Sequence, residues 1–304
     1  MSGGGHRPRA HDRGFIIVAV LWIVLALATF ASIYAAYVVR TADAVGSSDR
    51  RIRAQALFTA ALELTTYRLT AIDKDKRPPV GRFDFRMGRA TVLVDFGSEA
   101  GRIDLNAAPK PLLASLFVTL GARPADADND ADRVLAWRGA AAQNGGQDTE
   151  AEAYRAAGLN YAPRHAPFQD VGELWLVLGL PPALVERALP YVTVFSGVPQ
   201  VNVLAAPPLV LAALPGITPE QVNGVLAARR SVPDAQAVLA SLEGARDNVT
   251  VEMGRSVRVS VAVRLDDGSR ADADIVILLT DDGEEPYRIL SWRDDFDQIA
   301  SAGG

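Results

Sequence analysis

The sequence predicts an α+β protein in which a long N-terminal transmembrane helix precedes an antiparallel sheet, with a large α-helical domain inserted into that sheet. Three observations lead to this prediction. Residues 15–39 are apolar without one charged residue, strand-like alternation appears before residue 100 and again after residue 248, and helices separated by proline and glycine fill the interval. If both sets of strands form one sheet, the helical block is an insertion.

The apolar run of residues 15–39 is long enough to cross a membrane. At ~1.5 Å per residue it reaches ~37 Å, compared with ~30 Å for the hydrocarbon core of a bilayer. A secretory signal has a shorter apolar region followed by a small-residue cleavage site, and this run continues without one, so we expect the helix to stay attached. Arginines flank the run on both sides and therefore do not determine its orientation.

The junction before the apolar run carries a recognisable signal. A short basic leader ends at Gly14, and Phe15 begins the apolar run. This arrangement resembles the type IV prepilin signal, in which a membrane peptidase cuts on the cytoplasmic side after glycine. The resemblance implies a leader of residues 1–14, cleavage between Gly14 and Phe15, methylation as an accompanying modification, and a cytoplasmic N-terminus. A plain signal anchor, which is not cut, is the alternative interpretation.

Composition excludes several classes of function. The chain of 304 residues has no cysteine, which excludes disulfides, thiol catalysis and cysteine-ligated zinc. From Thr41 onward, 27 Lys and Arg face 35 Asp and Glu, and this net charge of −8 argues against nucleic acid as the main partner. His165 is the only histidine outside the leader, and no nucleophile elbow, P-loop or dinucleotide glycine pattern is present. We therefore expect no enzyme.

Residues 40–99 are predicted to hold an amphipathic continuation of the helix and the first strands. The expected buried face of the helix contains Leu57, Ala61, Leu64 and Tyr67. Gly46 and the two serines after it predict a kink or a frayed turn. Beyond two prolines, the alternating segments 82–87 and 90–96 predict a hairpin that turns at Gly88.

The helical block, residues 100–248, contains an internal repeat. Residues 103–116 (IDLNAAPKPLLASL) resemble residues 201–214 (VNVLAAPPLVLAAL) at an offset of 98. Each copy begins with a strand-like trio, and Ala-Ala-Pro then opens a helix. Asp170 and Thr218 are predicted N-caps within the block. Residues 249–304 are expected to add the remaining strands, with a hairpin at Asp267-Gly268.

The second copy ends in a helix, a Pro-Gly-Ile hairpin and another helix, which resembles the helix-hairpin-helix module. In many proteins that module holds DNA phosphates through backbone N–H groups at the start of the second helix. Glu220 lies in that turn and the domain is acidic, which favours helix pairs that simply pack as a compact α-domain. A membrane-anchored DNA-binding protein of an uptake system remains the alternative function.

Two acidic stretches are candidate calcium sites. Residues 126–132 (DADNDAD) lack the glycine and the terminal glutamate of an EF-hand loop, and Asp132 is predicted instead to cap the following helix. Asp148, Glu150 and Glu152 follow a Gly-Gly turn and could supply oxygen ligands to Ca²⁺, with a solvated loop as the alternative.

The complete order of segments resembles the K-type minor pseudopilin family of type II secretion, general secretion pathway protein K, along nearly the whole chain. The resemblance implies a pilin-like head that contains the helix-hairpin-helix-like insertion. The segments that carry it are RGFIIVAVLW at the start, GRIDLNAAP at 101–109, AWR at 136–138, YRAAGLNYAPRHAPFQDVGELWLVLGL at 154–180, and VNVLAAP at 201–207.

The resemblance implies a place at the pseudopilus tip, where the protein would nucleate assembly and bind the I- and J-type minor pseudopilins. It also implies processing by prepilin peptidase, a single-pass anchor in inner-membrane lipid and a periplasmic head, with no nucleic acid. Most pilins carry glutamate as the fifth mature residue, and Ala19 stands there instead. Family members often hold calcium in an acidic loop after the tryptophan of the first repeat. No acid immediately follows Trp137, so calcium stays open.

Overall fold

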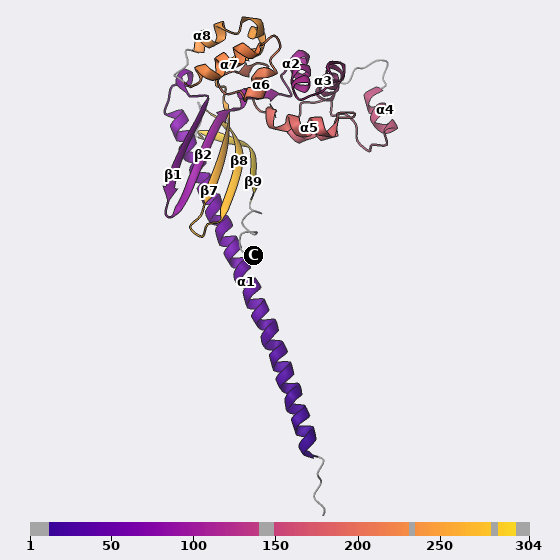
Figure 1. Ribbon diagram of the computed structural model, residues 1–304, viewed down its shortest axis with the longest axis vertical. Coiled ribbons are helices and arrows are strands. Elements are labelled where there is room, and N and C mark those ends of the chain that lie inside the picture. Colours follow the sequence, from indigo (N-terminus) through magenta and orange to yellow (C-terminus); the bar gives the residue numbers. More distant parts are fainter. Residues whose placement is uncertain (1–11, 140–148, 231–234, 281–284, 296–304) are drawn as a thin grey trace, which may run out of the picture.

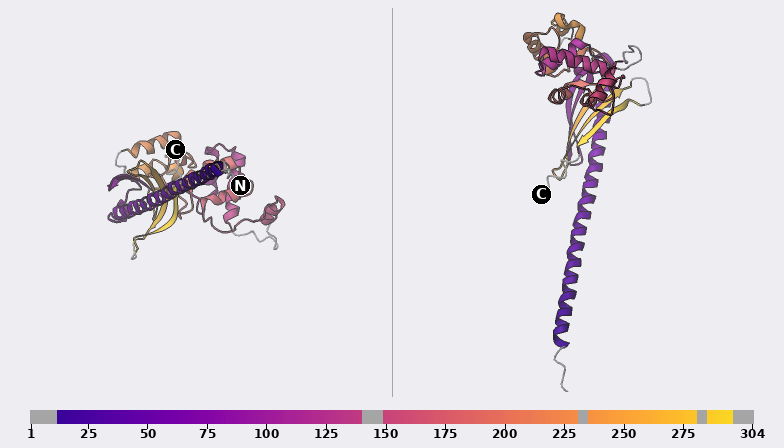
Figure 2. Two further views of the ribbon diagram at one scale, coloured as in Figure 1. Left: turned by 90° about the horizontal axis from the view of Figure 1, so that it is seen from below. Right: turned by 90° about the vertical axis from the view of Figure 1, so that its right-hand side faces the viewer.

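The computed structural model describes residues 12–139, 149–230, 235–280 and 285–295. A single long helix, α1 (Asp12–Thr70), forms the axis of the molecule. Its N-terminal part projects away from everything else, a five-stranded sheet lies along its C-terminal part, and a helical region lies at the end of the sheet farthest from the projecting part (Figures 1 and 2). The molecule is therefore a head on a long stalk.

The projecting part of α1 has the length and composition of a membrane-spanning helix. Residues Ile17–Ala35 are long and apolar enough to span one, and none of this segment is buried against the head. Its hydroxyl groups are satisfied within the helix, since Thr29 donates to the Leu25 carbonyl at 2.8 Å and Ser32 to the Ala28 carbonyl at 2.9 Å. The segment thus presents a mainly apolar surface, and its remaining exposed side-chain polar groups are the Trp22 indole and the Tyr34 hydroxyl.

The helix α1 runs through Gly46 without interruption and without a sharp bend (Figures 1 and 2), so the kink or frayed turn predicted there is wrong. A glycine costs a helix only about 1 kcal/mol relative to alanine. Long helical segments continue on both sides, and helix propagation is cooperative, so this local penalty does not end the helix.

The C-terminal part of α1 buries one face against the sheet. Buried residues recur at helical spacing: Ala54, Leu57, Phe58, Ala61, Leu62 and Leu69. The sequence correctly placed Leu57 and Ala61 on this face, whereas Leu64 is half-buried at its margin and Tyr67 is 71% exposed. Six residues after Ala61, at about 100° each, Tyr67 lies about 240° around the helix and faces solvent.

The sheet has the strand order β1-β2-β7-β8-β9, and every neighbouring pair is antiparallel. Its strands are β1 (Val80–Met87), β2 (Ala90–Ser98), β7 (Ser256–Arg264), β8 (Arg270–Leu279) and β9 (Tyr287–Asp295). The strands before and after the helical block are thus one sheet, as predicted. Ser98 at the end of β2 pairs with Val257 at the start of β7, so the insertion leaves and re-enters the sheet at the same end.

The face of the sheet toward α1 forms an apolar core with it. Valines and isoleucines that alternate along the central strands pack against the α1 face, and the Phe58 ring contacts the Trp292 ring edge-on at 6.4 Å. The Tyr287 hydroxyl donates to Glu63 Oε1 at 2.9 Å and ties β9 to α1. Burial, reinforced by the Glu63 carboxylate, raises the pKa of Tyr287 to about 12, so this donor stays protonated at neutral pH.

The insertion consists of two lobes, each closed by a short pair of parallel strands. In the first lobe, β3 (Ile103–Asp104) pairs with β4 (Val192–Thr193). In the second, β5 (Val201–Asn202) pairs with β6 (Val249–Thr250). The first lobe contains α2 (Lys110–Thr119), α3 (Pro124–Arg138), α4 (Thr149–Ala156), η3 (Val171–Leu176), α5 (Pro182–Ala188) and η4 (Leu189–Tyr191). The second contains α6 (Pro208–Ala212), α7 (Pro219–Ala228), α8 (Ala235–Ala240) and η5 (Glu243–Asn248).

Short 3₁₀ turns precede the sheet and the insertion: η1 (Lys74–Lys76) and η2 (Glu99–Gly101).

The 98-residue sequence repeat is a structural repeat. Asp104 Oδ1 accepts from the Asn106 N–H at 2.7 Å, and Asn202, 98 residues later, accepts from the Leu204 N–H at 2.8 Å in the same kind of turn. An arginine at the end of the second helix of each copy then holds this turn. Arg138 donates to the Leu105 and Ala108 carbonyls, and Arg229 donates to the Val203 carbonyl.

The predicted helix caps in the insertion were partly right. Thr218 caps α7 in a capping box with Gln221, and the Asp170 side chain accepts from the Gly172 N–H at the start of η3. The prediction for Asp132 is wrong, because α3 already begins at Pro124, whose ring fixes the φ that a first helical turn needs. Asp132 lies inside α3 and pairs with Lys110 at 2.8 Å.

The packing of α1 on the sheet gives a first prediction. Phe58 is fully buried, so Phe58→Ala should lower the free energy of unfolding by about 3–5 kcal/mol. The measurement is urea unfolding of the full chain in detergent micelles. Tyr67→Ala, on the exposed side of the same helix, is the matched control and should change it little. Equal effects of the two substitutions would contradict the assigned packing face.

Candidate functional site

The predicted cleavage site lies at the free end of the stalk. Gly14 and Phe15 fall in the first turn of α1, which begins at Asp12. Their side-chain surroundings lie outside the part of the chain that the structure describes. Cleavage between these two residues therefore stays a prediction.

The three candidate calcium ligands are not a formed site in the described structure. Asp148 lies outside the described residues. Glu150 and Glu152 are two positions apart on α4 and so point to different sides of that helix. Glu152 lies 4.0 Å from Arg155, and Glu150 lies 3.9 Å from His165 Nδ1. Within the described ranges no three His, Asp or Glu side chains gather as metal ligands would, and calcium stays an untested prediction.

The other acidic stretch is part of the helix α3 rather than a loop. Its carboxylates pair with cations on the lobe surface: Asp126 with Arg123 at 2.6 Å, and both Asp128 and Asp132 with Lys110 at 2.8 Å. Helical geometry cannot wrap these side chains around one ion, which agrees with the missing EF-hand glycine.

The segments that carry the family resemblance build the core of the first lobe. Trp137 of the AWR segment stacks on Phe168 at 6.1 Å and packs beside Tyr154 at 6.2 Å. Its indole N–H donates to Glu173 Oε2 at 3.1 Å, and Glu173 also pairs with Arg164 at 3.1 Å. These residues hold the lobe together, and their contacts account for the motif without any catalytic role.

His165 belongs to the loop around this core. Its backbone has φ of +50°, in the left-handed region, and its Nδ1 lies 3.3 Å from the Gly139 carbonyl oxygen. These contacts fit a loop residue that is positioned by packing, rather than a catalytic base.

The Pro-Gly-Ile hairpin is poorly suited to hold a phosphate. Gly216 has φ of +78°, and a Cβ there would lie 2.6 Å from the Gly244 carbonyl oxygen, so only glycine fits. The N–H of Gln221 already donates to Thr218 Oγ1. The backbone N–H of Glu220, and then the Thr218 hydroxyl, lower the pKa of the Glu220 carboxyl, so an anionic group already occupies the start of α7. This geometry opposes the DNA-binding alternative.

A buried ion pair joins the insertion to the sheet. Glu99 of η2 is 0% exposed, and its two carboxylate oxygens accept from Arg258 of β7 at 2.7 and 3.2 Å. Arg258 also pairs with Asp274 of β8, and the Thr193 hydroxyl of β4 donates to Glu99. Burial lowers the pKa of Arg258, but the hydrogen bonds and charges of Glu99 and Asp274 outweigh it and raise the pKa above its usual value.

The second lobe meets the sheet at the same place. A Cβ at Gly101 would lie 2.9 Å from the backbone carbon of Ala205, so the absence of a side chain permits this close approach. The Ser98 hydroxyl at the end of β2 donates to the Met253 carbonyl just before β7. We call the contacts among Ser98, Glu99, Gly101, Arg258 and Asp274 the junction.

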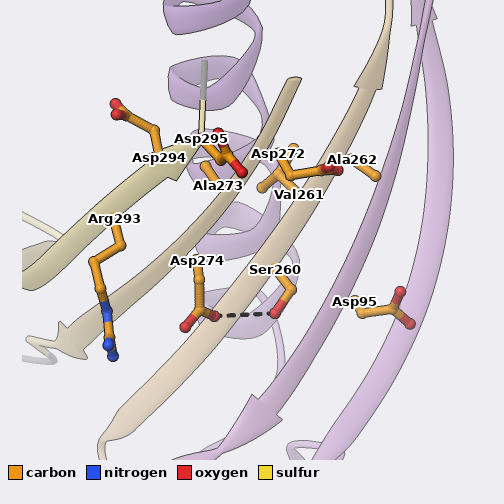
Figure 3. A pocket seen from close by; sticks show the side chains of 10 residues that line it. All are labelled: Asp95, Ser260, Val261, Ala262, Asp272, Ala273, Asp274, Arg293, Asp294 and Asp295. Atoms are coloured by element: carbon orange, nitrogen blue, oxygen red, sulfur yellow. Dashed lines mark hydrogen bonds between the residues drawn. The ribbon is translucent and has the colours of Figure 1, made fainter. Parts of the chain in front are cut away.

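The face of the sheet that points away from α1 is not covered by other elements of the described structure next to the junction. It carries two shallow cavities of ≈ 380 and ≈ 460 Å³, which share Ala262 and Asp272 in their linings. Small side chains such as Ser260 and Ala262 form the floor, and long charged side chains such as Arg293 form the rim (Figure 3). We call this surface the outer face. An apolar floor with a polar rim is the usual composition of a protein interface.

The sequence could not predict the junction. Glu99 and Arg258 are 159 positions apart, and neither belongs to a local motif. The only signal was that alternation along β7 places Arg258 with Ser260 and Arg264, on the side opposite the valines.

A long helix with an apolar N-terminal span and a second half that carries an antiparallel sheet defines the class: this architecture is consistent with a membrane-anchored subunit that has a pilin-like head. Residues 93–197, from β2 through the first lobe to β4, match the family described as Type II secretion system (T2SS), protein K. The match covers about a third of the chain and confirms the recognition made from the sequence. The family is one of minor pseudopilins, which are structural subunits rather than enzymes.

Comparison with solved structures supports the same fold. The chain aligns with one chain of the crystal structure of the GspK-GspI-GspJ complex from the type 2 secretion system of enterotoxigenic Escherichia coli. The TM-score is 0.53 at 15% identity, over 81% of this chain and 99% of that chain. No curated protein sequence matched.

The junction gives a second prediction. Glu99→Gln leaves the buried Arg258 without its main counter-charge, and breaking such a pair should cost about 3–5 kcal/mol of unfolding free energy. Urea unfolding of the full chain in micelles measures this. Asp95→Asn, which breaks the solvent-exposed pair with Arg82 on the same sheet, is the control and should have a small effect. If Glu99→Gln behaves like the control, the ion pair does not hold the insertion in place.

Proposed function

We propose that this protein is the minor pseudopilin that caps the tip of a type II secretion pseudopilus and nucleates its assembly with the I- and J-type minor pseudopilins. The position of the insertion is the observation on which the proposal rests. Both lobes lie at the end of the sheet farthest from the projecting part of α1 (Figure 1). Such a pseudopilus would grow as subunits pack their α1 helices side by side. The two lobes would obstruct the position directly above this head, where the next subunit would otherwise sit.

The apolar part of α1 supports the proposed location. We propose a single-pass anchor in the inner membrane, with a cytoplasmic N-terminus and a periplasmic head. Its exposed apolar surface would lie in lipid before assembly and against neighbouring helices afterwards. In both environments a helix without charged side chains is favoured.

Ala19 supports a terminal position in the filament. Other pilins place a glutamate there, which pairs with the N-terminal amine of a neighbouring subunit. A lone carboxylate in lipid costs a few kcal/mol unless it is paired. A subunit with no neighbour above it gains nothing from that carboxylate, and Ala19 avoids the cost.

The composition of the matched complex supports the proposed partners. That structure contains GspK together with GspI and GspJ. Because the present chain has the same fold over 81% of its length, we extend this association to it as part of the proposal.

The third prediction concerns the leader. Co-expression with a prepilin peptidase should give a product that begins at Phe15, and Gly14→Ala should abolish this cleavage because the peptidase cuts after glycine. Intact-protein mass spectrometry measures the N-terminus. Gly46→Ala, a glycine substitution in the same helix, is the control and should be processed normally. An uncut protein under a peptidase that processes other prepilins would leave a plain signal anchor.

The fourth prediction concerns assembly. The processed full chain, mixed in detergent with full-length I- and J-type minor pseudopilins of the same secretion system, should co-elute with both in size-exclusion chromatography. Omission of one partner at a time identifies which subunit this chain contacts directly. Elution of this chain alone from the complete mixture would refute the proposed place in the tip complex.

A further inference from the structure

Two arginines near the junction have no carboxylate within hydrogen-bond distance among the residues that the structure describes. Arg102 follows η2, and its Nε lies 3.9 Å from Glu99 Oε1, which is too long for a hydrogen bond. The oxygens of Glu99 already accept from Arg258 and Thr193. Arg293 of β9 makes no ion pair with any described residue.

The surroundings of Arg102 are confined and carry other positive charges. Its side chain is only 27% exposed. Burial first, and then the positive charge of Arg258, lower the pKa of Arg102, and Arg293 acts in the same direction. A guanidinium has five N–H donors, and none of those of Arg102 is among the buried polar atoms without a partner, so they remain accessible to an acceptor from outside.

The charges around the junction do not balance within the chain. At the end of the sheet beside the insertion, four arginines, Arg82, Arg102, Arg258 and Arg293, face three carboxylates, Asp95, Glu99 and Asp274, which leaves one positive charge in excess there. Asp272, Asp294 and Asp295 make the other end of the adjoining cavity acidic. Arg82 pairs with Asp95, and Arg258 pairs with both Glu99 and Asp274. The unmatched charge therefore belongs to Arg102 and Arg293, which we call the arginine pair.

Arg102 and Arg293 line two adjoining cavities, which together we call the groove. The strand register places Arg293 beside Asp274 on the outer face, and its side chain points away from the carboxylates of Asp294 and Asp295 (Figure 3). The ≈ 380 Å³ cavity next to Arg293 and a ≈ 170 Å³ cavity next to Arg102 share Asp95 and Ser260 in their linings. The second cavity is bounded on its other side by Ala205 and Pro207 of the second lobe.

We propose that the arginine pair binds a carboxylate side chain of a neighbouring minor pseudopilin, which enters the groove between the outer face and the second lobe. This inference rests on the proposed function, because it assigns a surface and a chemistry to the partner. A carboxylate neutralises the excess charge, and the planar forks of two guanidinium groups suit it geometrically.

A protein partner suits this groove better than a lipid headgroup. Among the residues of α1 whose burial the structure describes, the first buried one is Ala54, which comes 19 residues after the end of the apolar span at Ala35, about 28 Å along the helix. The groove lies still farther away, beside the insertion. Asp272, Asp294 and Asp295 rim the end of the groove that is farther from the second lobe. The part of the partner that binds near the second lobe therefore carries the carboxylate, and the part that faces these three aspartates carries no acidic group.

Cross-linking tests the chemistry directly. Lysine occurs only at 74, 76 and 110, and arginine does not couple to carboxylates under carbodiimide activation. In Arg293→Lys, the new amine should form an amide bond with the partner carboxylate as the carbodiimide takes up one water. Mass spectrometry should map this bond to one Asp or Glu of the I- or J-type subunit. Arg264→Lys, on the same outer face but at its opposite end, should give no such product.

Affinity is the second measurement, made with the full chain and full-length partners in detergent. Arg293→Glu should weaken binding about 10-fold at low salt and reduce its salt dependence, whereas Arg264→Glu should change it less than about 2-fold. Absence of binding by the natural chain would refute the proposed function and this inference together. Normal binding by Arg293→Glu, or cross-links only to carboxylates of the same chain, would overturn this inference alone.

Discussion

The buried contact between Glu99 and Arg258 determines how the two parts of the head fit together. A buried ion pair adds little net stability compared with apolar packing, but loss of either partner leaves an uncompensated charge in the interior. Two hydrogen bonds, at 2.7 and 3.2 Å, also fix the relative orientation of η2 and β7. Because the insertion leaves the sheet beside one of these residues and returns beside the other, this contact fixes both ends of the insertion at once.

Both lobes of the insertion meet the sheet beside the contact between Glu99 and Arg258. Each lobe is closed by two parallel strands, and Thr193, in the closing strand of the first lobe, donates directly to Glu99. The second lobe approaches through Ala205, which follows its own first strand and lies against Gly101. The two lobes therefore meet the sheet through different regions and in different ways: the first through a charged hydrogen bond from its closing strand, the second through close backbone contact after its opening strand. This asymmetry leaves the groove beside the second lobe.

Local signals in the sequence predicted local structure well. The hairpin around Gly88, the caps Asp170 and Thr218, and the 98-residue repeat could be read from neighbouring residues, because the interactions behind them span only a few positions. The errors at Gly46 and Asp132 arose where a local signal was outweighed, by cooperative helix propagation in one case and by an earlier start at Pro124 in the other. The junction could not be predicted, since its charged residues come from distant segments and meet only when the sheet forms.

The two ends of the molecule provide different forces for assembly. The apolar part of α1 associates through packing that salt does not screen, whereas exposed charges on the outer face interact over a Debye length of about 8 Å at physiological ionic strength. Packing between apolar helices holds subunits together but discriminates weakly among similar helices. The arginine pair and the acidic rim on the outer face differ in sign along the groove, and like charges in contact are strongly disfavoured. In the proposed assembly, α1 would contribute affinity and the head would determine which neighbour is accepted.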